Sequence, residues 1–155
     1  MAQEIERKFL VSDERWRASV ESSCRYRQGY LTEGGACSIR VRIAGGKANL
    51  NIKGATLGVV RTEYEYPLPL KDAEEMLDRF TLGAQIEKTR YFVRHGNHLW
   101  EIDVFEGANA GLVIAEIELD VVDEAFSLPP WAGREVSDDK RYYNVYLAHH
   151  PYSQW

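Results

Sequence analysis

The first charged residues of the chain, Glu4-Ile5-Glu6-Arg7-Lys8, have a spacing that can bind a cation. In an extended strand successive side chains point to opposite faces, so Glu4, Glu6 and Lys8 share one face. The two carboxylates then stand roughly 6.6 Å apart along the strand. Like charges placed in this way repel each other unless a cation lies between them. The spacing therefore predicts a metal ion beside this segment, with further ligands supplied by other strands.

The same alternation of charged and apolar residues recurs in six later segments. In residues 37–43, for example, Arg40 and Arg42 share one face and three aliphatic residues take the other. Two of the seven segments carry paired cations, and the last two carry paired carboxylates. The charged faces together hold the carboxylates Glu4, Glu6, Glu63, Glu65, Glu101, Asp103, Glu116 and Glu118 and the cations Lys8, Arg40, Arg42, Lys53, Arg61, Lys88 and Arg90.

An open antiparallel sheet, with one face in water and the other on a core, alternates in the same way. Like charges are nevertheless unfavourable neighbours on a solvent-exposed strand face. At roughly 6.6 Å, two unit charges repel by about 2.5 kcal/mol at an effective dielectric constant of 20 and by well under 1 kcal/mol in water. The pattern is tolerable on a wet face, whereas inside a concave barrel it needs a ligand. Charges sorted by sign suit a metal on one side and a polyanion on the other.

The elements that would position these residues are mostly strands. Eight strands with mostly short connections predict an α+β protein, mainly β, whose antiparallel sheet can close into a barrel covered by two or three helices. Strands are expected at residues 4–11, 24–31, 37–43, 47–53, 59–66, 85–94, 98–105 and 112–121. Helices are expected after a cap at Ser12, over residues 71–80, and from a cap at Ser137 to about Ala148.

Composition restricts the class of protein further. The 24 acidic residues outnumber the 19 basic ones, which argues against a nucleic-acid duplex as a general partner. A length of 155 residues suits a single domain over residues 1–155. Cys24 and Cys37 are expected to be free thiols in a reducing compartment. The charged N-terminal segment and the lack of a long apolar run predict neither a signal peptide nor a membrane span, so we expect a cytoplasmic protein.

The charged segments also resemble a known family. Glu4-Ile5-Glu6-Arg7-Lys8 resembles the E-x-E-x-K signature of the CYTH superfamily, the triphosphate tunnel metalloenzymes, and the resemblance covers nearly the whole chain. Further segments resemble strands of this family in the same order: Ile39-Arg40-Val41-Arg42, Leu50-Asn51-Ile52-Lys53-Gly54, Arg61-Thr62-Glu63-Tyr64-Glu65-Tyr66, Glu87-Lys88-Thr89-Arg90-Tyr91, Trp100-Glu101-Ile102-Asp103-Val104-Phe105 and Ala115-Glu116-Ile117-Glu118-Leu119.

This resemblance implies an eight-stranded antiparallel closed barrel, the triphosphate tunnel fold, with a hydrophilic interior and a few covering helices. It also implies hydrolysis or cyclisation of triphosphates with Mg²⁺ or Mn²⁺. The chain is most similar to the short bacterial branch, whose members include inorganic tripolyphosphatases that release pyrophosphate and phosphate. Other branches include class IV adenylate cyclases, thiamine triphosphatases and fungal RNA triphosphatases.

The resemblance assigns roles to individual residues. For Glu65 and Glu101 two roles stay open, since either residue could bind the metal or simply pair with a tunnel cation. A second metal could activate the attacking water. Tyr30, in Gln28-Gly29-Tyr30, resembles the tyrosine of a Lys–Tyr pair that takes part in proton transfer in this family, and Lys53 would be its lysine. A lysine among cations has its charged form disfavoured, so Lys53 could act as a base. The phosphate-binding residues would be Lys8, Arg40, Arg42, Lys53, Arg61, Lys88, Arg90 and Lys140. The metal ligands would be Glu4, Glu6, Glu63, Asp103, Glu116 and Glu118.

Three functions compete at this stage. The first is metal-dependent hydrolysis of inorganic tripolyphosphate, and the second is hydrolysis or cyclisation of a nucleoside or thiamine triphosphate. The third is a non-catalytic polyphosphate-binding module, against which the many carboxylates count. No segment is obliged to supply an apolar pocket for a base, which favours the inorganic substrate. A homodimer is the common default for a small barrel, with the regions of Trp131 and Trp155 as candidate contact surfaces.

Overall fold

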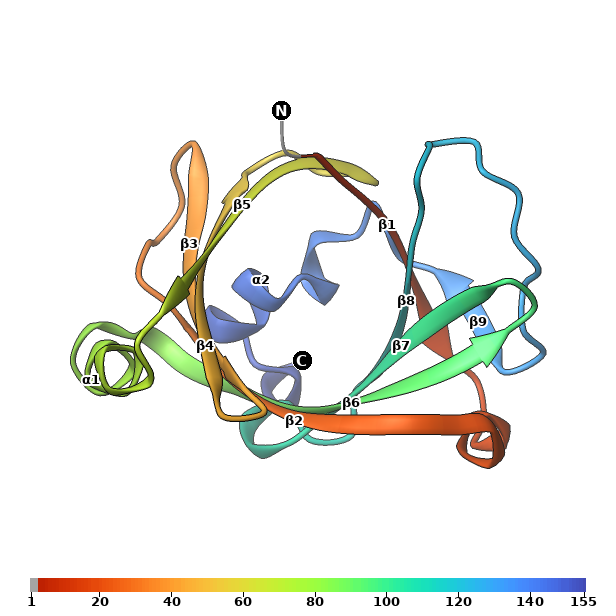
Figure 1. Cartoon of the computed structure of the whole chain (residues 1–155), viewed down its shortest axis with the longest axis horizontal. Helices are drawn as coiled ribbons and strands as arrows, with labels where there is room; N and C mark the ends of the chain where they lie inside the picture. The colour runs from red at the N-terminus through yellow and green to blue at the C-terminus, as the bar shows by residue number, and fades with distance from the viewer. Residues whose placement is uncertain (1–2) are drawn as a thin grey trace.

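The structure is a computed structural model that describes residues 3–155. Its strands form a closed antiparallel barrel around a central opening (Figure 1). The strands are β1 (Gln3–Val11), β2 (Val20–Tyr30), β3 (Cys37–Ala44), β4 (Lys47–Gly54), β5 (Val60–Leu68), β6 (Leu82–His95), β7 (His98–Phe105), β8 (Val113–Glu118) and β9 (Ala132–Glu135). The α-helices are α1 (Leu70–Phe80) and α2 (Asn144–His149), and 3-10 turns cover Arg15–Ser19, Gly107–Asn109, Lys140–Tyr142 and Tyr152–Gln154.

Eight strands close the ring, in the order β5-β4-β3-β2-β6-β7-β8-β1. The ring is completed by β1 and β5, which pair over Gln3↔Thr62, Glu4↔Arg61 and Ile5↔Val60. The ninth strand, β9, pairs with the second half of β1. The predicted eight-stranded antiparallel barrel is therefore confirmed, with one short strand added outside the ring.

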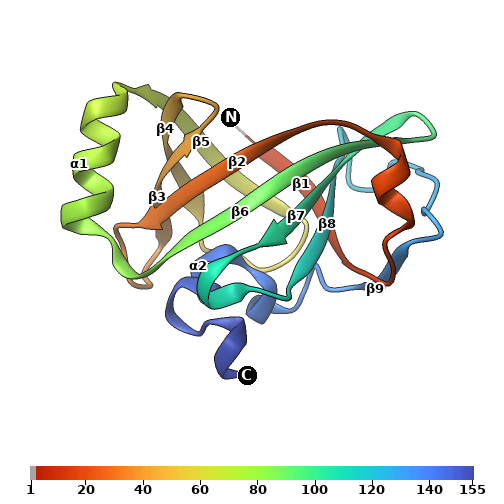
Figure 2. The same ribbon diagram turned by 90° about the horizontal axis from the view of Figure 1, so that it is seen from below.

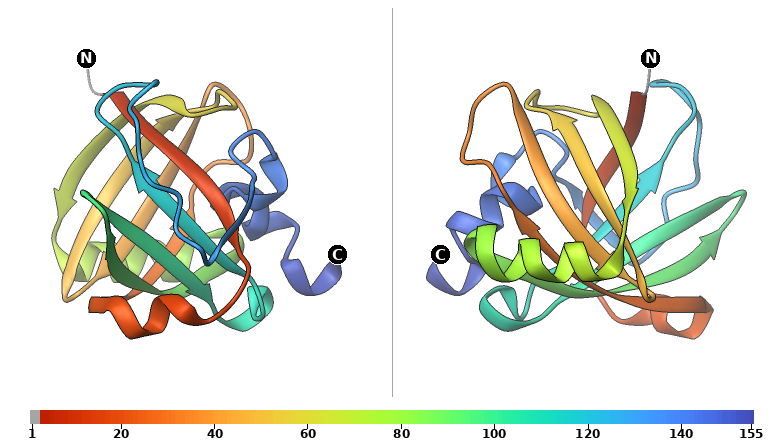
Figure 3. Two further views of the ribbon diagram at one scale, coloured as in Figure 1. Left: turned by 90° about the vertical axis from the view of Figure 1, so that its right-hand side faces the viewer. Right: turned by 60° about the vertical axis from the view of Figure 1, so that its left-hand side comes forward.

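The helices cover different parts of the barrel. Helix α1 lies across the outside of β3 and β4, whereas α2 lies at one end of the barrel (Figures 2 and 3). A side chain on Gly29 would place its Cβ 2.5 Å from Thr81 Oγ1, just after α1, so only glycine permits this close approach of strand and helix. Among residues 3–155, no helix has both the length and the apolarity needed to cross a lipid bilayer.

The apolar residues lie outside the ring of strands rather than within it. One cluster contains Phe9, Trp16, Trp100 and Trp131 beneath the loop that follows β8, and another packs beneath α2 around Leu147. A third packs α1 against the barrel. Because the core is outside the ring, the opposite faces of the same strands turn inward, and these are the charged faces.

Several sequence expectations about elements were wrong. The third helix is broken, because Tyr143 is extended (φ −79°, ψ 138°) between a 3-10 turn and α2. Ser137 does not cap it; the Ser137 hydroxyl accepts a hydrogen bond from Lys8 N at 2.9 Å, and Asp139 caps the 3-10 turn instead. The Ser12 hydroxyl likewise donates to Trp131 O at 3.0 Å rather than capping a helix.

Other boundaries also differ. Strand β2 begins at Val20, four residues before the predicted start, and β8 ends at Glu118 instead of at residue 121. The side chain of Trp131, expected in a contact surface, is buried in the aromatic cluster, with its ring centroid 5.6 Å from that of Trp100. Trp155 is 47% exposed, so only this part of the expected surface is accessible.

Candidate active site

The inward faces of the strands enclose a cavity of about 290 Å³ at the centre of the barrel. Each strand from β1 to β8 contributes at least one side chain, and three strands supply a single one each: Tyr30 from β2, Lys53 from β4 and Glu101 from β7. Three further side chains, Tyr143, Asn144 and Val145, come from the segment at the start of α2. The other lining residues are Glu4, Glu6, Lys8, Ser38, Arg40, Arg42, Lys53, Arg61, Glu63, Glu65, Lys88, Arg90, Glu116 and Glu118. Of the residues predicted for the site, only Asp103 and Lys140 do not line this cavity.

One side of the cavity concentrates carboxylates because β1 lies between β5 and β8. The strand register places Glu6 opposite Glu118 and Lys8 opposite Glu116. Burial raises the pKa of Glu118, and repulsion from Glu4, Glu6 and Glu63 raises it further. These four side chains therefore form an acidic wall in which negative charge is only partly compensated.

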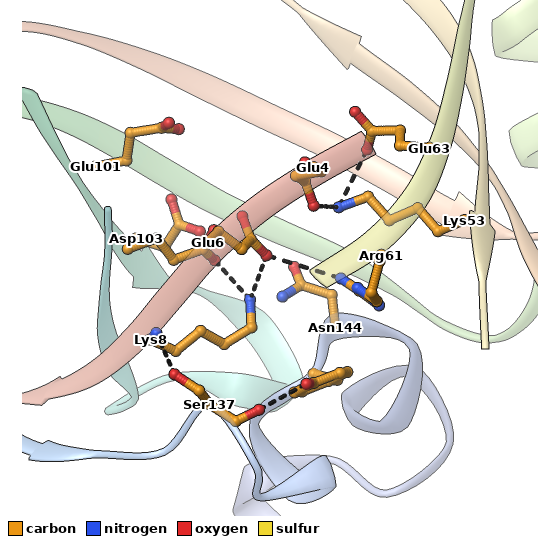
Figure 4. Close-up of polar contacts among 12 residues, drawn as sticks. Glu4, Glu6, Lys8, Lys53, Arg61, Glu63, Glu101, Asp103, Ser137 and Asn144 are labelled. Carbon is orange, nitrogen blue, oxygen red and sulfur yellow. Dashed lines mark hydrogen bonds and ion pairs between the residues drawn. The ribbon is translucent and has the colours of Figure 1, made fainter. Parts of the chain in front are cut away.

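Two lysines lie among these carboxylates (Figure 4). Lys53 Nζ lies 2.8 Å from Glu4 Oε1 and 3.1 Å from Glu63 Oε2. Lys8 Nζ lies 3.2 Å from Glu6 Oε1 and 3.0 Å from Glu116 Oε1. Although burial opposes it, attraction to Glu116 and Glu6 raises the pKa of Lys8. The ammonium groups thus take up part of the negative charge in the acidic wall.

The acidic wall fits a divalent metal by the chemistry of its donors. Mg²⁺ and Mn²⁺ prefer oxygen ligands, and carboxylates that repel one another gain stability when a cation lies between them. Within residues 3–155 no three His, Cys, Asp or Glu side chains are already arranged as a metal cluster. Glu118, which forms no ion pair among the described residues, is the carboxylate best placed to accept a cation without displacing a lysine.

The opposite side of the cavity holds cations with few counterions. Arg40 is 6% exposed, and its Nε has no hydrogen-bond partner among the described residues. Arg42 Nε donates to Gln28 Oε1 at 2.8 Å, and its guanidinium lies over the Tyr26 ring at 4.6 Å. Burial, with repulsion from Arg40 and Arg90, lowers the pKa of Arg42 to about 10. Two neighbouring guanidinium groups that line a cavity and pair with no carboxylate within residues 3–155 are a site for an anion.

Asp103 binds two other cations on this side of the cavity, Lys88 and Arg90, which together with Arg40 and Arg42 we call the basic wall. Its carboxylate accepts from Lys88 Nζ at 2.7 Å and from Arg90 Nε and Nη2 at 2.7 and 2.9 Å. Burial alone would raise the pKa of Asp103, yet Arg90 and Lys88 hold it at about 2. Because Asp103 is fully buried and all three bonds come from cations, the arrangement favours a counterion over the predicted metal ligand.

Lys88, rather than Lys53, is the tunnel lysine that lies close to other cations, namely Arg90 and Arg42. Burial lowers the pKa of Lys88 to about 7, against the attraction of Asp103 and together with repulsion from Arg90 and Arg42. The sequence argument placed Lys53 among cations, but its near neighbours are Glu4 and Glu63. The premise was therefore wrong for Lys53, because the neighbouring strand β5 brings Glu63 to it and β1, beyond β5, brings Glu4. The proton-transfer role of Lys53 with Tyr30 stays a prediction.

The remaining predicted residues differ in their placement. Tyr30 is 4% exposed and lines the cavity, while Arg61 Nη2 lies 3.7 Å from Glu6 Oε1. Lys140 is exposed and lines two neighbouring surface pockets rather than the tunnel. Glu101 pairs with Arg90, as one of the alternatives for that residue anticipated.

Sequence reasoning missed Asn144. Its Oδ1 accepts hydrogen bonds from Gln28 Nε2 and Lys88 Nζ, both at 2.9 Å, so it connects α2 to the basic wall (Figure 4). Gln28 is fully buried and also contacts Arg42. Gln28 belongs to the Gln28-Gly29-Tyr30 stretch noted in the sequence, but Asn144 carries no charge and lies in no such motif, and the proximity of the two residues exists only in the folded chain.

An enclosed tunnel with an acidic wall, a basic wall and covering helices defines a class of protein. A CYTH domain matches residues 2–146, and the chain belongs to the CYTH family. An inorganic triphosphatase from Acetivibrio thermocellus is 43% identical over 155 residues, covering 100% of this chain and 99% of that protein. One from Nitrosomonas europaea is 39% identical over 149 residues, covering 94% and 96%. The crystal structure of an inorganic triphosphatase matches with a TM-score of 0.69 at 37% identity, covering 96% of this chain and 95% of the other.

Proposed function

We propose that the protein hydrolyses inorganic tripolyphosphate to pyrophosphate and phosphate with Mg²⁺ or Mn²⁺ in the tunnel. The single observation that carries the proposal is the pair of guanidinium groups of Arg40 and Arg42, which pair with no carboxylate among the described residues and face the same cavity as the acidic wall. The similarity to two inorganic triphosphatases over nearly their full lengths supports the same substrate.

The residues of the basic wall would bind the substrate. Arg40 and Arg42 each have donors free for phosphate oxygens, and arginine can contact two oxygens at once. Asp103 keeps Arg90 in a fixed orientation through two hydrogen bonds, so little reorganisation is needed when an anion binds. Preorganised positive charge is the main contribution a protein makes to phosphoryl transfer.

The acidic wall would bind the metal through Glu4, Glu6, Glu63 and Glu118, with Glu116 at its edge. When bound, the ion would neutralise charge on the phosphates and lower the pKa of a coordinated water. Lys53 and Lys8 would exchange carboxylate contacts for substrate oxygens. Tyr30 would place its hydroxyl at the cavity surface for the proton transfer predicted with Lys53.

Phosphate release tests the proposal. Tripolyphosphate, ATP and thiamine triphosphate are compared in Mg²⁺ and in Mn²⁺ by a malachite-green assay, together with detection of cyclic AMP. We expect fastest release from tripolyphosphate, and a large loss in Glu4→Gln but not in the exterior variant Glu21→Gln. No release from any substrate would leave a binding module as the better description, and cyclic AMP formation would indicate a cyclase.

Further properties belong to the same proposal. We place all 155 residues in one CYTH domain, since Tyr152 N near the C-terminus donates to Asn109 Oδ1 of the barrel at 2.8 Å; residues 1 and 2 lie outside the described part. The cytoplasmic location, the absence of a nucleic-acid duplex or membrane partner, and homodimer formation remain predictions from the sequence.

A further inference from the structure

Asn144, the first residue of α2, places its side chain at the wall of the tunnel cavity (Figure 4). Its Oδ1 accepts hydrogen bonds from Gln28 Nε2 on β2 and from Lys88 Nζ on β6, both at 2.9 Å. Gln28 Oε1 in turn accepts from Arg42 Nε on β3 at 2.8 Å. One amide oxygen of α2 is therefore connected to two cations of the basic wall, directly to Lys88 and through Gln28 to Arg42.

The donors and acceptors of this network permit one orientation of the two amides. The Arg42 guanidinium and the Lys88 ammonium carry donors alone, so each of them needs an oxygen atom. The oxygen of Gln28 must therefore face Arg42, which turns its NH2 group toward Asn144. The oxygen of Asn144 must then accept from both Gln28 and Lys88. The two cations at its ends thus fix the orientation of the whole network.

These contacts orient the two cations without cancelling their charge. Both amides are neutral, and the guanidinium of Arg42 also lies over the Tyr26 ring at 4.6 Å. Lys88 Nζ lies 5.4 Å from the centroid of the Phe105 ring. Among the described residues, the one carboxylate paired with Lys88 is Asp103, which it shares with a second cation. Because amides and ring faces attract a cation but carry no net charge, the positive charge remains available to an anion.

Helix α2 has apolar anchors that do not depend on Asn144. Leu147 and Ala148 are buried in the cluster beneath the helix, together with Ile86 of β6. A Cβ on Gly83 would lie 2.5 Å from Ala148 O, so helix and strand approach closely there as well. We therefore expect a change of the Asn144 side chain to leave the helix in place, which allows its effect on the tunnel to be measured in a folded protein.

We propose that Asn144 is a positioning residue of the tunnel, which holds Lys88 directly and Arg42 through Gln28 so that both cations face the phosphates with their charge uncancelled. This inference rests on the proposed function, because it assumes that triphosphates bind in the tunnel. Asn144→Asp keeps the accepting oxygen and the shape of the side chain but adds a negative charge. Asn144→Ala removes the acceptor and adds no charge. The two variants therefore separate the effect of charge from the effect of orientation.

The test measures the affinity for the imido analogue of tripolyphosphate, in which NH replaces the bridging oxygens, by calorimetry in Mg²⁺. We expect each variant to raise Kd by about tenfold or more, the effect of one hydrogen bond to a charged group. The melting temperature without ligand should rise in Asn144→Asp, because the carboxylate is a counterion for cations that repel each other, and should fall in Asn144→Ala. A purely structural role predicts weaker binding only where stability is also lost, so the opposite signs in Asn144→Asp distinguish the two roles.

Asn109 is the matched control, since it is also a buried asparagine and its Oδ1 accepts from Tyr152 N at 2.8 Å, away from the cavity. Asn109→Ala and Asn109→Asp should leave Kd for the analogue unchanged, whatever they do to stability. A loss of affinity in these variants as large as in the Asn144 variants would overturn the proposal.

A double-variant cycle tests the connection through Gln28. Gln28→Met removes both of its hydrogen bonds at similar side-chain length, so it breaks the same connection to Arg42 as Asn144→Ala does. The loss of affinity in the double variant should therefore be smaller than the product of the two separate losses. Losses that multiply would show that the two residues act independently and would overturn the connection.

Hydrolysis and binding distinguish this inference from the proposed function. Absence of phosphate release from tripolyphosphate in the unchanged protein, with the affinities in the expected order, would refute the proposed function alone. An affinity of Asn144→Asp equal to that of the unchanged protein would overturn the role of Asn144, whatever the rate of hydrolysis.

Discussion

Replacing Arg40 by methionine tests whether the basic wall is arranged for a ligand or for the stability of the fold. Methionine keeps an unbranched side chain of similar reach and removes the charge together with the buried Nε that has no partner. The variant therefore changes electrostatics more than packing. For stability and for activity, the structure predicts effects of opposite sign.

The free energy of unfolding should rise. Arg40 and Arg42 are two residues apart on β3, roughly 6.6 Å along the strand, so their repulsion is about 2.5 kcal/mol at an effective dielectric constant of 20. The lowered pKa of Arg42, to which Arg40 contributes, reflects this repulsion. Part of it is offset by lost contacts, and a net gain near 1 kcal/mol raises the melting temperature of a chain of this size by roughly 2 to 4 °C.

The rate of hydrolysis should fall. A hydrogen bond to a charged group contributes about 1.5–3 kcal/mol, and Arg40 is placed to make at least one to the substrate. A loss of about 3 kcal/mol in the transition state corresponds to a roughly 100-fold decrease in kcat/KM.

Both quantities are measured on the same samples, by differential scanning fluorimetry without metal and by phosphate release with tripolyphosphate. Arg27→Met is the matched control, since Arg27 bonds Gln85 and Asp78 on the outside of the barrel and should affect hydrolysis little. A melting temperature well below that of the unchanged protein would refute the argument. So would a kcat/KM that stays within about threefold of the original value.

Three further predictions concern Glu118, Glu101 and Tyr30. A divalent ion at about 100 times its Kd stabilises a folded protein by about 2.7 kcal/mol, so Mg²⁺ or Mn²⁺ should raise the melting temperature. The rise should be smaller in Glu118→Gln than in the exterior control variant Glu21→Gln. Equal rises in the two variants would contradict Glu118 as a metal ligand. Because burial and neighbouring carboxylates raise the pKa of Glu101 to about 7 from 4.5, the folded state binds an extra proton between these values. Stability without metal should therefore fall as pH rises from about 4.5 to 7, and Glu101→Gln should flatten this fall; a pH profile identical to that of the unchanged protein would refute the assignment. Tyr30→Phe should lower kcat for tripolyphosphate about 100-fold if the hydroxyl moves a proton, with Tyr64→Phe on the outer surface as the control; full kcat would remove Tyr30 from the chemistry.

Much of the barrel could be predicted from the sequence because strand alternation is a local property. Wherever the backbone of this segment is extended, Arg40 and Arg42 must lie on the same face, and the aliphatic residues that alternate with them must lie on the other face. The element ends were less predictable. The break at Tyr143 depends on a hydroxyl contact with Gly58 and Ser137, and β9 exists because it finds β1 as a partner. Such contacts join residues far apart in the chain and leave no local pattern.

The sequence by itself determined which residues turn inward and that like charges lie together along single strands. It also determined the family, through motifs spread over nearly the whole chain. Only the tertiary structure decided which charges meet. Strand order places Lys53 beside Glu4 and Glu63, encloses Asp103 behind Lys88 and Arg90, and leaves Arg40 without a counterion in the described part of the chain. The physical reason is that Coulomb energy depends on distance and burial across strands, which alternation along a strand does not specify.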